Sequence, residues 1–139
     1  MADIVVTAAR VGLIDPLKAD VRSYIAAEAI TKGQAVYLTT AGKAGVADAN
    51  AAGKLQFRGI ALNTVGAGQA VDVCHEGELY GFAVSALNAD AILYLSNTAG
   101  ALSDAAGATS VAAARVVALT DKGATKIIRV FTRWSADWA

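Results

Sequence analysis

The sequence predicts an all-β fold, a compact β-sandwich or barrel with at most short helical turns. Three observations indicate this class. Runs of β-branched and aromatic residues are separated by turns of small residues, in a chain with 13 glycines and one proline. No long amphipathic segment is present that could act as a crossover helix between parallel strands. The third observation is an internal repeat.

The repeat is clearest at residues 58–62 (Arg-Gly-Ile-Ala-Leu), which recur as residues 115–119 (Arg-Val-Val-Ala-Leu), 57 positions later. The same offset relates residues 70–73 to residues 127–130. Matches that share one offset are not expected from an alanine-rich composition alone. We therefore predict two copies of one β unit. The copies span residues 29–74 and 86–131.

The chain begins with a β-branched run at residues 3–7 (Asp-Ile-Val-Val-Thr), which is suited to an extended segment and is ended by Pro16. Such an arm can pair with a sheet edge of its own fold or of a neighbouring protein. A first strand of the domain's own sheet is the open alternative. The predicted organisation is an N-terminal arm or first strand at 1–28, a single β domain at 29–134 and a C-terminal tail at 135–139.

The remaining elements follow from local patterns, with a weak strand around Tyr24. The alanine-rich residues 47–54 are adequate for one helical turn. The polar residues 75–78 (His-Glu-Gly-Glu) predict a turn, and Gly81 predicts a bulge or a close backbone contact. Strands are expected at residues 35–38, 56–62, 70–75, 79–84 and 126–134.

The last of these strands is apolar on both faces. Ile128 and Val130 alternate with Ile127 and Phe131, so we expect one face to meet the core and the other to meet a second subunit. Tryptophan supplies large contact areas at interfaces, although Trp134 could equally cap the core. The candidate subunit-interface residues are Ile127, Phe131, Trp134 and Trp138.

The amino-acid composition indicates which classes of partner are expected. Hydrophobic residues make up 55% of the chain and charged residues 17%, which predicts apolar surface that a monomer would leave exposed and therefore a homo-oligomer. No uninterrupted apolar stretch of about 18 residues occurs, since Asp90 and Asp104 break the most apolar region, and no signal-peptide pattern begins the chain. Twelve basic and twelve acidic residues cancel without a basic cluster. We therefore expect neither a membrane nor a nucleic-acid partner.

The densest group of titratable residues is Asp72, Cys74, His75, Glu76 and Glu78. Nucleophilic catalysis needs the thiol and a base within hydrogen-bond reach, but adjacent residues on a strand point to opposite faces. A closed metal site normally takes about four ligands, which this group does not readily supply. We expect a solvated polar hairpin end, with no catalytic residue, no metal and no cofactor. Cys74 is the single cysteine, so no internal disulfide forms.

With these residues in view, the chain resembles the capsid cement, or head decoration, proteins of tailed bacteriophages. The likeness covers most of the chain and lies in the order and spacing of its segments, because no single motif is chemically diagnostic. The segments are residues 3–8, 28–38, 58–62, 68–71, 94–104 and 115–119.

The resemblance implies a non-enzymatic, β-rich protein, commonly a homotrimer, on the outer surface of the virion head. Such a protein binds where major capsid protein subunits meet, is added in the host cytoplasm and resists the pressure of packaged DNA. The candidate capsid-binding residues, chosen for strand addition, are Asp3, Ile4, Val5, Val6 and Thr7. The alternatives are another virion component, such as a head-fibre base or a tail protein, and a small hydrolase or metal-binding enzyme built on Cys74 and His75.

Overall fold

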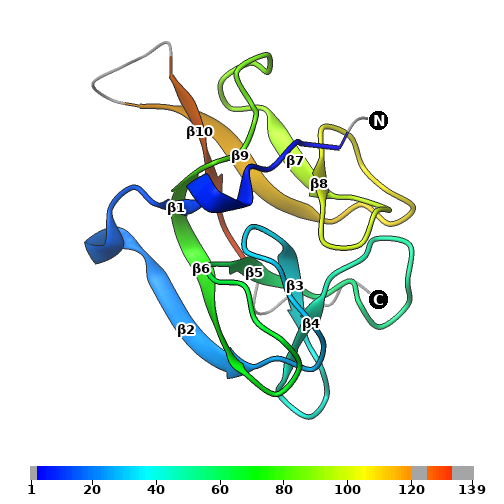
Figure 1. Cartoon of the computed structure of the whole chain (residues 1–139). Coiled ribbons are helices and arrows are strands. Elements are labelled where there is room, and N and C mark those ends of the chain that lie inside the picture. Colours follow the sequence, from blue (N-terminus) through cyan, green and yellow to red (C-terminus); the bar gives the residue numbers. More distant parts are fainter. Residues whose placement is uncertain (1–2, 120–124, 133–139) are drawn as a thin grey trace.

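The computed structural model describes residues 3–119 and 125–132. These residues form one curled, antiparallel, 10-stranded sheet, and their helical elements are two 3-10 turns, η1 (Ala8–Arg10) and η2 (Pro16–Lys18) (Figure 1). The all-β prediction is confirmed. Among the described residues, none of the helical elements has the length and hydropathy that spanning a bilayer would require. The strands are β1 (Gly12–Leu13), β2 (Asp20–Ile25), β3 (Ala35–Leu38), β4 (Ala44–Val46), β5 (Phe57–Ala61), β6 (Ala70–Tyr80), β7 (Ile92–Leu95), β8 (Leu102–Ser103), β9 (Ala112–Ala118) and β10 (Lys126–Val130).

The two units have the same strand connectivity. The sheet order is β4-β3-β5-β6-β10-β9-β7-β8, so each unit repeats one pattern of neighbours and the units meet where β6 pairs with β10. An irregularity in the strand pairing recurs as well. The register of β3 with β5 shifts between Val36 and Tyr37, and that of β7 with β9 shifts between Leu93 and Tyr94. These two positions are equivalent in the two copies of the repeat.

Backbone conformation repeats as well. Gly33 has a positive φ of 94°, and its equivalent, Asp90, has a φ of 69° and is the single non-glycine residue with positive φ among those described. Aspartate is one of the few side chains that tolerate this left-handed conformation. The chain therefore makes the same turn before β3 and before β7, once with glycine and once with aspartate.

The units differ in one register. Val36 lies opposite Gly59 in the first unit, whereas Leu93 lies opposite Ala114 in the second. If both strands of the second unit followed the same offset, Val116, the equivalent of Gly59, would lie opposite Leu93. A shift of two residues keeps every side chain on its original face of the sheet, because side chains alternate with a period of two. The two copies can therefore differ in register and still bury the same faces.

The buried side chains form two clusters. The main core draws on both units, with Phe57 and Ile60 packed in the same cluster as Leu93 and Ile128. The second cluster, which includes Val71, lies on the other face of the first unit and is built from β3 to β6 with the segment after β2. An isolated parallel bridge from Ala26 to Ala44 brings the end of β2 next to β4, so that the strands of this unit nearly close around that cluster.

Strand β6 is longer than predicted. Residues 75–78, expected to form a turn, lie inside this 11-residue strand, so that expectation is wrong. The local pattern is polar, but the pairing of β6 with four neighbouring strands outweighs it. Residues 47–54 form turns without a helix, and the weak strand around Tyr24 is the full strand β2.

Gly81, which follows β6, has the close backbone contact that the sequence predicted. A Cβ atom there would lie 2.7 Å from the backbone nitrogen of Val11. Any larger residue would push the N-terminal part of the chain away from β6, so glycine is needed at this crossing.

Replacing Val130 by aspartate should destabilise the fold by about 3 kcal/mol or more, because an unpaired carboxylate would enter the apolar core. Val130 is fully buried and packs in the main cluster. The same substitution at Val5, which is 69% exposed, is the matched control and should leave the melting temperature almost unchanged. Equal thermal melts for the two variants, followed by circular dichroism, would show that this face of β10 is not packed as described.

Candidate functional site

The N-terminal segment, residues 3–7, lies along its own domain. The backbone N–H of Ile4 donates to the carbonyl of Leu102 (2.8 Å). The N–H of Thr7 donates to the carbonyl of Gly81 (2.9 Å). The segment therefore bridges β8 and the chain that leaves β6, and it is not the free arm that one reading of the sequence predicted. Residues 1–28 also contribute β1 and β2, which both pair with β6.

Side chains of this segment alternate between the core and the surface. Ile4 is 9% exposed and belongs to the main core, whereas Val5 is 69% exposed. Asp3 and Thr7 are also exposed, and the Asp3 carboxylate accepts a hydrogen bond from the Ser96 hydroxyl. Of the five candidate capsid-binding residues, Ile4 is thus used inside its own domain. Val5 and Thr7 offer free side chains on one outward-facing ridge.

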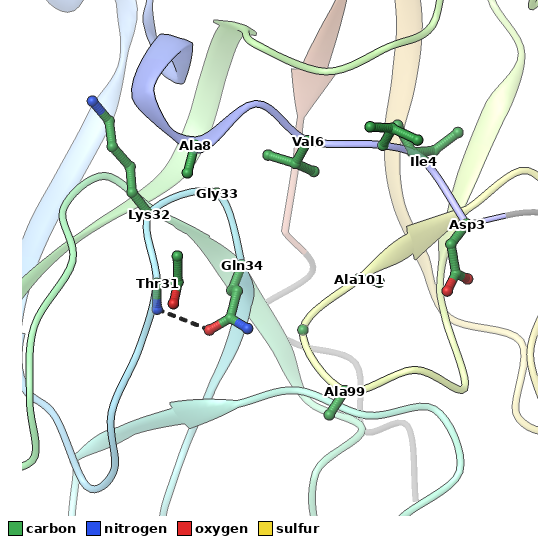
Figure 2. Close-up of a pocket in the computed structure, with 12 residues that line it drawn as sticks. Asp3, Ile4, Val6, Ala8, Thr31, Lys32, Gly33, Gln34, Ala99 and Ala101 are labelled. Atoms are coloured by element: carbon green, nitrogen blue, oxygen red, sulfur yellow. Dashed lines mark hydrogen bonds between the residues drawn. The ribbon is translucent and has the colours of Figure 1, made fainter.

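A groove runs beside this ridge. It has a volume of about 400 Å³ and lies between the N-terminal segment and the turns at residues 31–34 and 99–101 (Figure 2). The backbone N–H of Thr31 donates to Gln34 Oε1 (2.9 Å), which fixes the first turn. Gly33 allows the close approach, since a Cβ atom there would lie 2.7 Å from Val6 Cγ1. The groove is lined by backbone, small apolar side chains and the polar Thr31 and Gln34, a surface suited to an extended peptide.

Only some of the candidate subunit-interface residues are exposed enough to contact a second subunit. Ile127 is 3% exposed, so the prediction that it faces a second subunit is wrong. It borders a hollow with Tyr80 and Phe82 of its own chain. Phe131 is partly buried. Trp134 and Trp138 lie outside the described residues. The two apolar faces of β10 are therefore explained in part by burial within one chain.

Cys74 and His75 are buried inside β6, so the expectation of a solvated hairpin end is wrong for them, whereas Asp72 and Glu76 are exposed. Both side chains have no exposed surface. The Nδ1 atom of His75 hydrogen-bonds the carbonyl of Arg58, and its Nε2 atom lies 2.7 Å from the Tyr24 hydroxyl. A carbonyl can only accept, so Nδ1 carries the proton and Nε2 accepts from Tyr24. The two rings meet edge to face at 5.6 Å.

This centre ties three strands together. Tyr24 lies on β2, Arg58 on β5 and His75 between them on β6. No local sequence pattern indicates this hydrogen bond, because Tyr24 and His75 are 51 residues apart and only strand pairing brings them together. The histidine therefore serves as a buried cross-link between neighbouring strands.

Ionisation in this region does not favour nucleophilic chemistry. Burial, with smaller contributions from Asp20 and Glu76, raises the pKa of the Cys74 thiol to about 11. The reactive thiolate is therefore scarce at neutral pH. Burial also lowers the pKa of His75, which keeps the imidazole neutral. Within residues 3–119 and 125–132, no group of three or more His, Cys, Asp or Glu side chains is placed to hold a metal ion.

No protein-family model matches the chain, and no curated protein matches it in sequence.

The stability of the fold should fall as the pH drops below 6.5, the ordinary pKa of histidine. The pKa of His75 is lowered in the folded state, so its contribution is complete above that pH and is lost as protonation reaches the lowered value. A His75→Gln variant isolates this contribution. The free energy of unfolding should be measured by urea for both proteins between pH 7.5 and pH 5. We expect the difference in unfolding free energy between the parent and the His75→Gln variant to become smaller as the pH falls from 7.5 to 5. A difference that stays constant over this range would contradict the buried, neutral state of His75.

Proposed function

We propose that the protein is a capsid cement protein, which binds the outer surface of a tailed-phage head and stabilises contacts between major capsid protein subunits. One observation carries this proposal. The segments that resemble the cement proteins occur in the same order and spacing along most of the chain, in both copies of the repeat. The double β unit agrees with the β-rich architecture that the resemblance implies.

The N-terminal ridge and the groove beside it supply the best contact surface for the head. Val5 and Thr7 point outward from a segment that is itself held by backbone hydrogen bonds. A rigid ridge loses little conformational entropy on binding, and this favours affinity. In this proposal an extended strand of the major capsid protein lies in the groove, against the Lys32 turn.

The proposal includes assembly as a homotrimer on the virion surface after addition in the host cytoplasm. Several copies of the ridge on one particle raise the apparent affinity through avidity. Because Ile127 is buried within the chain, the trimer contact must use other surface. Phe131 is the remaining candidate among the described residues.

Two other functions compete with this one. A head-fibre base or a tail protein would also be a β-rich virion component, and it would be present at a few sites of the particle. A small hydrolase at Cys74 is disfavoured, because the thiol is buried and its pKa is about 11. The copy number on the head therefore separates the cement proposal from its nearest competitor.

Glutamate substitutions at Val5 and Thr7 together should weaken binding to expanded heads of the encoding phage at least tenfold and leave the fold intact. Both side chains are exposed, so the fold should tolerate the change, whereas a desolvated charge would oppose docking. Co-sedimentation with heads measures binding, and negative-stain images show coverage. The matched control is Leu17→Glu at a side chain that is 96% exposed elsewhere on the chain.

We expect the parent and the Leu17→Glu control to coat the shell in many copies. The Val5→Glu, Thr7→Glu variant should lose at least tenfold in affinity, and its circular dichroism spectrum should match that of the parent. Full coating by this variant would reject the ridge as the contact. Binding of the parent at one vertex or at the tail alone would reject the cement function.

A further inference from the structure

A second hollow lies beside the N-terminal segment, away from the groove of Figure 2. It has a volume of about 320 Å³ and lies between η1, the end of β6 and the start of β10. The groove is lined by Ile4 and Val6 of the N-terminal segment, whereas Thr7 and Arg10 line this hollow. The N-terminal segment therefore separates the two.

The floor of the hollow is apolar. Phe82 is 7% exposed and Ile127 is 3% exposed, and both line the hollow. Phe82 packs in the main core, whereas Ile127 belongs to neither buried cluster. Tyr80, which is 46% exposed, adds an aromatic side chain, and Gly12 leaves room for it, since a Cβ atom there would lie 3.0 Å from Tyr80 Oη. An apolar group placed in the hollow would therefore meet aliphatic and aromatic side chains.

Two cationic residues border this floor. Arg10 is exposed and, among the described residues, has no ion pair and no side-chain hydrogen bond. The ammonium of Lys126 donates to the carbonyls of Leu87 (2.5 Å) and Ser85 (3.4 Å), which are neutral acceptors. None of the described residues that line the hollow is acidic. Two positive charges therefore stand beside the hollow without a carboxylate to balance them.

This local excess of positive charge differs from the rest of the chain, in which 12 basic and 12 acidic residues cancel. Nearby cations on the sheet are balanced, because Glu78 lies opposite Arg129 across β6 and β10, and Asp90 lies 3.5 Å from Arg115. Charges beside an apolar surface are less screened by water than charges that are fully solvated. The hollow therefore favours an anion that carries an apolar group.

We propose that the hollow binds an acidic residue of a protein partner, together with an apolar group next to it. The carboxylate lies at the cationic rim and forms charge-assisted hydrogen bonds, for which the planar guanidinium of Arg10 is well suited. The apolar group lies against Phe82 and Ile127 and is removed from water. Both parts are needed, because an anion alone would leave the floor exposed to water.

The position of the hollow indicates which protein supplies the acidic residue. Thr7 belongs to the proposed head-binding ridge and also lines the hollow. A protein segment that covers Val5 and Thr7 would therefore reach the hollow with its next residues. The partner is then the major capsid protein. This identification rests on the proposed function, whereas the chemistry of the hollow does not.

Two small probes of the free protein test the chemistry without a phage head. N-acetylphenylalanine carries a carboxylate beside an apolar ring, and N-acetylphenylalaninamide has the same ring without the charge. We expect the acid to shift the backbone amide resonances of Gly81, Ala83 and Ile127 in nuclear magnetic resonance spectra. It should bind about tenfold more tightly than the amide, which is the effect of one charge-assisted hydrogen bond. Inorganic phosphate, the probe for a simple anion site, should bind more weakly than the acid.

Variants of the free protein locate the effect. Arg10→Gln should remove the preference for the acid over the amide, whereas Lys18→Gln, at an exposed residue of η2, should keep it. Equal affinities of the parent for the acid and the amide would overturn the proposal, and so would tighter binding of phosphate. Resonance shifts confined to other parts of the surface would overturn it as well.

Binding to expanded heads tests the partner. Arg10→Glu and Lys18→Glu change the net charge equally, but only the first should weaken co-sedimentation, by about tenfold at low salt and by less at high salt. Equal coating by the two variants would show that the head does not use the hollow and would overturn the proposal. If the parent itself coats no heads, the proposed function fails, and the probe measurements alone decide whether the hollow binds a carboxylate.

Discussion

The structure depends on β6 changing its partners halfway along its length. Residues up to Glu76 pair with β2 on one edge, and residues 73–74 pair with β5 on the other. From Gly77 onward the partners are β10 and β1. One strand thus holds both β units in a single sheet. At the point of exchange the buried His75 hydrogen-bonds β5 through Arg58 and β2 through Tyr24, which keeps the first set of partners in place.

Features with a local or periodic signal in the sequence could be predicted, whereas features that depend on contacts between residues far apart in the chain could not. The repeat, the all-β class and the close contact at Gly81 could be predicted, because each has a local or periodic signature. The middle of β6 could not, since His-Glu-Gly-Glu has the local chemistry of a turn and becomes strand only by pairing on both edges. The Tyr24–His75 bond and the burial of Ile127 also required tertiary contacts. The β-branched pattern of residues 3–7 was compatible with a free arm and with a strand of the domain's own sheet. The segment is neither, since it is held against its own domain by isolated bridges and by the burial of Ile4.

The distribution of polar and apolar groups separates structure from recognition. The residues with the most reactive chemistry, Cys74 and His75, are buried and serve the packing of β6. The exposed large apolar side chains are Val5 on the N-terminal ridge, Val21 and Ile25 on β2, Leu17 in η2 and Tyr80 at the end of β6.

The central claim is that the pairing of β6 with β10 makes the two units one cooperative fold. Native-state hydrogen exchange tests it most directly, because it measures the free energy of opening for each amide. We expect the slowest amides of β5 in the first unit and of β9 in the second to exchange with the same opening free energy, equal to that of global unfolding. Amides of one unit that open at a cost lower by about 2 kcal/mol or more would show that the units unfold separately and would contradict the claim.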